Sequence, residues 1–207
     1  MITASYYTEL LLPQVPGWCS KDKAEKLIQV IRENDLQLCV EIGVFGGSSF
    51  FPQALAMKDK ASGMVIGIDP WTKDSALEDM TNEANKNWWG SLNLESIYHG
   101  FMKTVEKYDL QKFCTVFRNK SEHVVDQIQD ESVDLLHIDG NHCERLAYQD
   151  SVLFLPKVKQ GGYVFFDDIS WVESGSVAST QKGLAYLKDF CDEIGIIGKD
   201  CMILQKK

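Results

Sequence analysis

The sequence lacks the features that mark secreted or membrane-embedded proteins. Its six cysteines include no CxxC pair and no series of metal-ligand spacings, so we expect reduced, structural thiols. No charged-then-apolar leader opens the chain, and no apolar run approaches the length of a membrane span. Internal repeats and low-complexity linkers are also missing. These absences predict a cytoplasmic protein that has no membrane partner.

The sequence has fewer basic than acidic residues. The chain has 21 Lys and Arg against 30 Asp and Glu, which gives a net charge of −9. Because phosphate contacts need clustered Lys and Arg, this charge argues against a nucleic-acid partner. The apolar fraction of 44% is typical of a globular protein, and 207 residues suffice for one domain with a full core. We therefore expect a single domain over residues 1–207.

Continuous apolar segments alternate with helical patterns. Strands that are too apolar to be half-exposed are predicted at residues 38–45, 64–71, 114–119, 133–139 and 162–168. Helical patterns are found at residues 20–34, 48–58, 91–108, 121–129, 144–158 and 180–193, and residues 193–207 predict two short strands around a turn. The alternation predicts an α/β fold: a Rossmann-like, mostly parallel seven-stranded sheet with helices on both faces and a C-terminal antiparallel hairpin.

Two segments are longer than this alternation requires. Residues 1–36 join an aromatic- and proline-rich cap to the first helix, and residues 72–113 form an extended insertion between strands. Both could fold over a cleft as lids that select a ligand. Alternatively, Trp88 and Trp89 of the insertion pack into the core or into a dimer interface, which leaves a homo-oligomer open.

Acidic or small residues stand at the ends of four predicted strands. In open α/β sheets ligands bind beyond the carboxyl ends of the strands, so these residues are expected to converge on a binding site. They are Glu41 with Gly43, Asp69, Asp139, and Asp167 with Asp168.

The turn EIGVFGGSS at residues 41–49 joins a strand to a helix through glycines. Glycine lets a ligand approach the backbone, and free amides at a helix start can hold an anion. The spacing is not GxGxxG, and a structural tight turn would explain it about as well. Asp69 lies roughly 20 or more residues further on, where an acidic residue can accept both ribose hydroxyl protons. Alternatively, Asp69 is a solvated or helix-capping residue before Pro70.

Four ordered motifs together carry a family resemblance. They are the turn at 41–49, GID at 67–69, DLLHIDGNH at 134–142 and GGYVFFDD at 161–168. In this order they resemble class I S-adenosylmethionine-dependent methyltransferases. The match is nearest to the small metal-dependent O-methyltransferases, which include catechol O-methyltransferase and the macrolide sugar O-methyltransferases. The similarity covers roughly residues 37–170, and the flanks agree in topology only.

The resemblance implies a set of cofactor-binding residues. Gly43 would lie beneath the methionine part of S-adenosylmethionine, Asp69 would bind the ribose hydroxyls, and Trp71 would flank the adenine. Ser121 matches an adenine position, although it could equally be a helix N-cap. The full predicted set is Glu41, Gly43, Gly47, Ser49, Asp69, Trp71, Ser121 and Glu122.

Asp139, Asp167 and Asp168 are the predicted metal ligands. Three adjacent carboxylates repel one another unless a cation neutralises them or some become protonated, and hard oxygen ligands indicate Mg²⁺, with Mn²⁺ or Ca²⁺ as alternatives. The resemblance implies that the ion holds two substrate oxygens. For the Asp167–Asp168 pair the alternative is a role as turn residues.

His142 follows Asp139 by three residues, the position of the general base in related enzymes. An imidazole titrates near neutral pH and can remove a hydroxyl proton, although a lone histidine is more often structural. His137, inside the strand, is interpreted as a packing residue. The catalytic prediction is therefore His142 together with Asp139.

The combined prediction is a metal-dependent O-methyltransferase acting on a small molecule, such as a sugar or polyol or, less favoured, a catechol. Asn141 and Cys143 depart from the residues that relatives usually have, which weakens any claim on the acceptor class. One alternative is a metal-independent N- or O-methyltransferase. Another is a non-catalytic S-adenosylmethionine-binding protein with an assembly or regulatory role.

Overall fold

One seven-stranded sheet organises the protein. The computed structural model describes residues 6–175 and 177–207, so residues 1–5 of the predicted cap and Ser176 lie outside the described residues. The strands are β1 (Leu38–Ile42), β2 (Met64–Ile68), β3 (Cys114–Phe117), β4 (Val133–Ile138), β5 (Val158–Phe166), β6 (Cys191–Ile197) and β7 (Cys201–Lys206). Their order is β3-β2-β1-β4-β5-β7-β6, with β1 to β5 parallel and β7 antiparallel to β5 and β6. The predicted fold class is confirmed.

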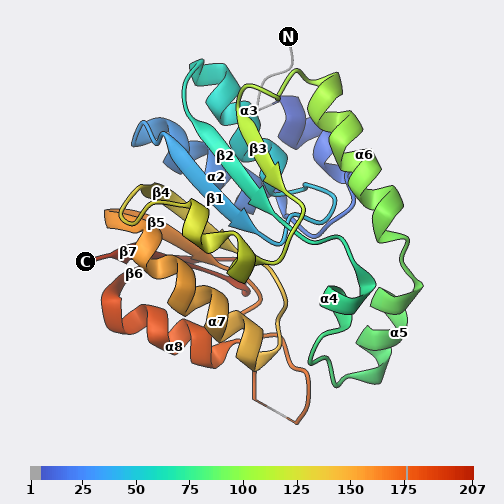
Figure 1. Ribbon diagram of the computed structural model, residues 1–207. Coiled ribbons are helices and arrows are strands. Elements are labelled where there is room, and N and C mark those ends of the chain that lie inside the picture. The colour runs from blue at the N-terminus through green and yellow to red at the C-terminus, as the bar shows by residue number, and fades with distance from the viewer. Residues whose placement is uncertain (1–5, 176) are drawn as a thin grey trace.

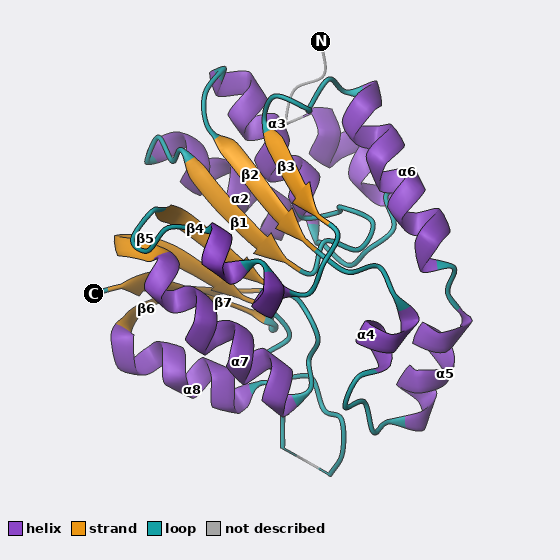
Figure 2. Cartoon of the chain, in the orientation of Figure 1, coloured by secondary structure: helices purple, strands orange, loops and turns teal. Residues whose placement is uncertain are grey.

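Helices cover both faces of this sheet. They are α2 (Lys21–Glu33), α3 (Phe50–Lys60), α4 (Lys73–Leu77), α5 (Glu83–Ser91), α6 (Leu94–Lys107), α7 (Glu144–Phe154) and α8 (Gln181–Phe190). Short π- and 3₁₀-turns lie at Tyr7–Leu11, Leu12–Gln14, Ser121–His123, Val125–Gln127 and Leu155–Lys157. Figures 1 and 2 show α7 and α8 on one face, α2 and α3 on the other, and α4 and α5 beyond the strand ends. None of the helices in the described part of the chain combines the length and apolar character needed to cross a bilayer.

The core has two layers because successive strand residues point to opposite faces. Cys39 and Leu135 pack with α2, α3 and α6, whereas their neighbours Val40 and Leu136 pack with α7 and α8. Both faces of the sheet are therefore buried, which explains why the parallel strands are continuously apolar.

Helix α2 begins where the sequence predicted. The Ser20 hydroxyl accepts a hydrogen bond from the Lys23 backbone N–H at 3.1 Å, an N-cap that satisfies one free donor of the first turn. Ala24 and Leu27 are fully buried on the face towards the core. Lys23 shares that face and is only 5% exposed. A charged side chain thus enters the interior from α2.

Several predicted helices differ from the structure; those at 144–158 and 180–193, for example, end earlier, at Phe154 and Phe190. Residues 121–129 form two single 3₁₀ turns, because the β-branched Val124 and Val125 face the core and favour a short connection over a continued helix. The helix predicted at 91–108 starts at Leu94, since the Asn93 side chain caps it by accepting from the Ser96 N–H at 3.0 Å.

Gly43 allows the tips of β1 and β4 to meet. Its φ is +86°, and a Cβ built there would lie 1.9 Å from the backbone oxygen of Asp139. The glycine is therefore required by backbone packing at the strand ends, independently of any ligand.

We expect Gly43→Ala to destabilise the protein by at least about 1–3 kcal/mol, because the new methyl overlaps backbone and the φ is unfavourable. Urea unfolding gives the free energy directly. Gly100→Ala is the matched control: Gly100 is exposed within α6 and nothing lies within 4 Å of its added Cβ, so stability should stay equal or rise. Equal stability of the two variants would contradict this account of the turn.

Candidate active site

A cavity of about 520 Å³ lies beyond the carboxyl ends of the parallel strands. Such a position and volume suit a small-molecule site. It brings together most of the predicted residues: Gly43, Ser49, Asp69, Trp71, Ser121, Glu122, Asp139, His142, Asp167 and Asp168. Glu41 and Gly47 lie behind this lining, because Glu41 is fully buried and an added Cβ on Gly47 would meet the rings of Phe51 and Phe101. Their direct contact with a cofactor stays a prediction.

Asp69 and Trp71 form one side of the cavity. The Asp69 carboxylate accepts hydrogen bonds from the Phe45 N–H at 2.9 Å and the Trp71 N–H at 2.7 Å. The Trp71 indole N–H in turn donates to the Phe45 carbonyl at 2.8 Å. Burial raises the pKa of Asp69 to about 6, although the two backbone N–H groups oppose the shift. Asp69 is thus held in a fixed orientation by the glycine turn.

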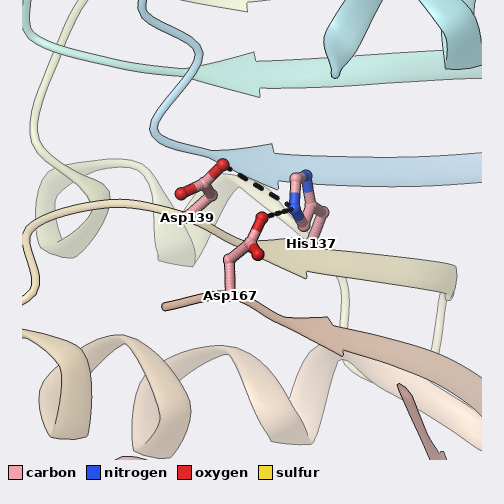
Figure 3. A group of neighbouring side chains, drawn as sticks. All are labelled: His137, Asp139 and Asp167. Atoms are coloured by element: carbon pink, nitrogen blue, oxygen red, sulfur yellow. Dashed lines mark hydrogen bonds and ion pairs between the residues drawn. The ribbon is translucent and has the colours of Figure 1, made fainter. Parts of the chain in front are cut away.

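The interpretation of His137 as a packing residue is wrong. The β1–β4 register places it opposite Glu41, and its fully buried ring lies 3.2 Å from Glu41 Oε2 through Nδ1 and 3.2 Å from Asp167 Oδ2 through Nε2. Figure 3 shows the ring turned towards Asp139 and Asp167. Burial alone would lower the pKa of His137, but the Asp167 and Glu41 carboxylates outweigh it and raise the pKa to about 10. The two carboxylates therefore favour the protonated form of the His137 ring.

Glu41 is held from its other side by helix α3. Its Oε1 accepts from the Ser49 hydroxyl at 2.9 Å, and its Oε2 accepts from the Gln53 amide. Glu41 thereby ties the start of α3 to β1 and supports His137 from behind the cavity.

Lys23 brings a second cation to the strand ends. Its ammonium donates to Asp167 Oδ2 and lies 3.6 Å from Asp139 Oδ2. Burial acts to lower the pKa of Lys23, but the two carboxylates outweigh it and keep the amine protonated. Burial would likewise raise the pKa of Asp167, yet His137 and Lys23 lower it well below its usual range.

Glu41, Asp139 and Asp167, with Lys23 and His137, form a largely buried corner at the strand ends. Asp139 is the least neutralised carboxylate of this corner. Lys23 and His137 are two cations facing three carboxylates, those of Glu41, Asp139 and Asp167. Burial and the repulsion of Asp167 raise the pKa of Asp139 well above its usual value. Asp139 can therefore take up a proton, a hydroxyl donor or a further cation.

The predicted metal ligands divide between two groups of side chains. The inner group is His137, Asp139 and Asp167, and the outer group is Asp139, His142 and Asp168. In the outer group, Asp168 Oδ2 lies 3.0 Å from His142 Nε2. Burial raises the pKa of Asp168, although the neighbouring His142 acts to lower it. The His142 ring also packs against Trp171, with ring centroids 4.7 Å apart.

The outer group has a donor set that fits a divalent cation. Its two carboxylates and one imidazole line the cavity, and one ligand atom from each lies within 4.8 Å of the others. Such oxygen-rich sets suit Mg²⁺ or Mn²⁺. In the inner group, by contrast, Asp167 Oδ2 already binds Lys23 and His137.

Aromatic side chains from distant segments meet at the cavity. Trp18 of the N-terminal segment stacks on Phe45 with centroids 5.4 Å apart, and it lies 5.2 Å from Trp88 and 6.0 Å from Trp89 of α5. All four line the cavity, and Trp18 is 66% exposed. The predicted cap and insertion thus both contribute to the cavity surface.

Polar contacts fasten the insertion to the strand tips. The Asn141 amide donates to the Glu78 carbonyl at 3.0 Å, and Glu173 Oε2 accepts from the Thr81 and Asn82 N–H groups at 3.0 and 3.1 Å. The Asn141 amide also donates to the Ser75 carbonyl at 3.3 Å, and its oxygen accepts from the Cys143 N–H at 2.9 Å, so the asparagine side chain serves backbone groups on both sides.

Sequence reasoning missed four cavity-lining or adjoining residues: Lys23, His137, Asp150 and Glu173. Lys23 carried a signal, since it falls on the apolar face of α2 between Ser20 and Leu27. His137 carried one as well, a histidine within a central apolar strand. Asp150 accepts from the Ser121 hydroxyl, and burial raises its pKa to about 7; nothing in its helical context distinguishes it.

Solved O-methyltransferases share this fold. The O-methyltransferase TomG from Streptomyces achromogenes, solved with SAM, aligns with 98% of this chain and 94% of its own at a TM-score of 0.66 and 15% identity. The Bacillus cereus O-methyltransferase, solved with SAH, aligns with 99% and 96% at a TM-score of 0.65 and 14% identity. At these identities the likeness shows the common fold.

Sequence comparison gives the family. An uncharacterized protein of Sinorhizobium fredii is 31% identical over 138 residues, which are 66% of this chain and 13% of that longer protein. Residues 40–169 match the model of the methyltransferase domain family Methyltransf_24, from β1 to the residues just after Asp168. With that match spanning more than half of its length and containing every strand-tip acid described above, the chain belongs to this methyltransferase family.

Proposed function

We propose that the protein transfers a methyl group from S-adenosylmethionine to a hydroxyl group of a small molecule, with a divalent cation held by Asp139 and Asp168 of the outer group and with His142 of that group as the base. One observation carries the proposal: the same cavity is lined by Asp69 and Trp71 on one side and by Asp139, His142 and Asp168 on the other. The first pair suits a nucleoside, and the second set suits proton removal from a hydroxyl.

The donor side would work through orientation. The Asp69 carboxylate, fixed by two backbone N–H groups, would accept the ribose hydroxyls, and the Trp71 ring would flank the adenine. Bound S-adenosylmethionine supplies an electrophilic methyl group on a positively charged sulfur. Because transfer to an oxyanion removes that charge, a cavity shielded from water favours the transition state.

The acceptor side would work through proton transfer. Asp168 holds the His142 imidazole through Nε2, so Nδ1 would receive the proton of the acceptor hydroxyl, and Asp168 would stabilise the imidazolium. Asp139 and Asp168 would hold the divalent ion, which supplies charge stabilisation for the acceptor oxygens. An ion of this kind favours an acceptor with neighbouring oxygens, as in a sugar, a polyol or a catechol.

The rival functions differ in what they need from the outer group. A metal-independent methyltransferase would keep full activity in EDTA, and a non-catalytic binding protein would bind S-adenosylmethionine without turnover. The aromatic cluster of Trp18, Phe45, Trp88 and Trp89 suits a small acceptor that contains a ring.

We expect His142→Ala to lower kcat for methyl transfer by about 10²–10⁴-fold, because a positioned general base is lost. Transfer from radiolabelled S-adenosylmethionine to a panel of diols, with Mg²⁺ or EDTA, measures it. The control is His99→Ala, an exposed histidine on α6 that pairs with Glu95 and should leave kcat unchanged. If His142→Ala turned over as fast as the wild type, His142 would not be the general base.

We expect the affinity for S-adenosylmethionine to fall as the pH drops through about 6. Below its pKa of about 6 Asp69 becomes protonated and can accept fewer ribose hydroxyl protons, so the dissociation constant should rise towards acid. Calorimetric titration at pH 7.5 and 5.0 measures the change. In Asp69→Asn the affinity should be weak at both pH values; an unchanged pH profile in that variant would assign the effect to another group.

A further inference from the structure

Lys23 places a fixed positive charge inside the corner of strand-tip acids. Its side chain is 7% exposed, and its ammonium contacts Asp167 Oδ2 and lies 3.6 Å from Asp139 Oδ2. The lysine also lines the cavity. No other described lysine pairs with either of these two aspartates.

The position of this ammonium is set by helix α2. The Ser20 N-cap fixes the first turn, and the fully buried Ala24 and Leu27 anchor the same face against the core. The buried side chain of Lys23 starts from this fixed turn and reaches the two carboxylates. The contact is therefore built into the fold.

A divalent ion shared by Asp139 and Asp167 would have to lie about 2.0–2.6 Å from an oxygen of each carboxylate. The inner oxygens face other partners: Asp167 Oδ2 contacts Lys23 and, at 3.2 Å, His137 Nε2, and Asp139 Oδ2 lies 3.9 Å from the same ring nitrogen. Figure 3 shows both carboxylates turned towards that histidine. An ion placed between them would overlap the ammonium and be repelled by its charge.

We propose that Lys23 is the resident cation of this corner and competes with divalent ions for Asp139 and Asp167. It confines a divalent ion to the outer group and keeps the metal affinity of the whole corner low. This inference rests on the proposed function only where that function places an ion at Asp139 and Asp168. Lys23 acts as a positioning residue, because its charge sets which carboxylate oxygens are free.

The test is Mn²⁺ binding to Lys23→Met, measured by calorimetry and by the spin resonance of free Mn²⁺, with neither methyl donor nor acceptor present. We expect at least tenfold tighter binding than in the wild type, because removal of the ammonium frees the inner oxygens. Lys21→Met is the matched control. It removes the same charge from the same helix, but Lys21 is half exposed and pairs with Glu9, so the Mn²⁺ affinity should not change.

A second substitution shows which oxygens the ion gains. In Lys23→Met with Asp167→Asn the tenfold gain should disappear, since Asp167 supplies the freed oxygen. A gain that survives loss of Asp167 would place the ion elsewhere and overturn the proposal.

Thermal unfolding covers the case in which the variant folds poorly. Both Lys23→Met and the more polar Lys23→Gln should have a lower Tm than the wild type in EDTA, and Mn²⁺ should raise their Tm by more than it raises that of the wild type. Affinities within twofold of the wild type, or variants that stay unfolded even with Mn²⁺, would refute competition by Lys23. Because no donor or acceptor is present, a protein inactive towards every acceptor would leave this result unaffected.

Discussion

The structure depends on neutralising carboxylates that are buried together at the strand ends. Glu41, Asp139 and Asp167 converge because parallel strands bring their carboxyl ends to one edge. An unpaired buried carboxylate is costly, and removing one partner of a buried pair is more damaging than never having the pair. Lys23 and His137 supply the counter-charges, from a helix on one face and from the neighbouring strand. The corner is thereby stable and still one positive charge short.

The incomplete neutralisation of these carboxylates determines the electrostatics of the cavity. Asp139 is left with a raised pKa at the edge of the cavity, beside the pair formed by His142 and Asp168. A fully neutralised site would have little reason to bind a cation or an acidic hydroxyl, and the incomplete neutralisation of Asp139 is the feature on which the proposed function relies. The insertion and the N-terminal segment add tryptophans to the lining of the same cavity. Membership of a methyltransferase family agrees with this division of labour between donor and acceptor sides.

The sequence predicted the sheet well because its signals are local. Apolar runs, the Ser20 cap and the acids at four of the strand ends needed no knowledge of tertiary contacts. The cavity lining also followed, since strand direction alone brings Asp69, Asp139 and Asp168 to one edge. The counter-charges did not follow: Lys23 lies over a hundred residues from the aspartates it contacts, and His137 was hidden by the apolar residues around it. The 3₁₀ turns at 121–127 were missed because core packing, not propensity, decides them.

The protonation state of His137 tests this account most directly, because the buried carboxylates require an imidazolium there. A pH titration followed by nitrogen NMR of histidine-labelled protein, assigned with a His137→Gln variant, measures it. The account predicts that both ring nitrogens of His137 remain protonated at pH 8, in keeping with a pKa of about 10. A His137 ring that is neutral at pH 7 in the folded protein would contradict it.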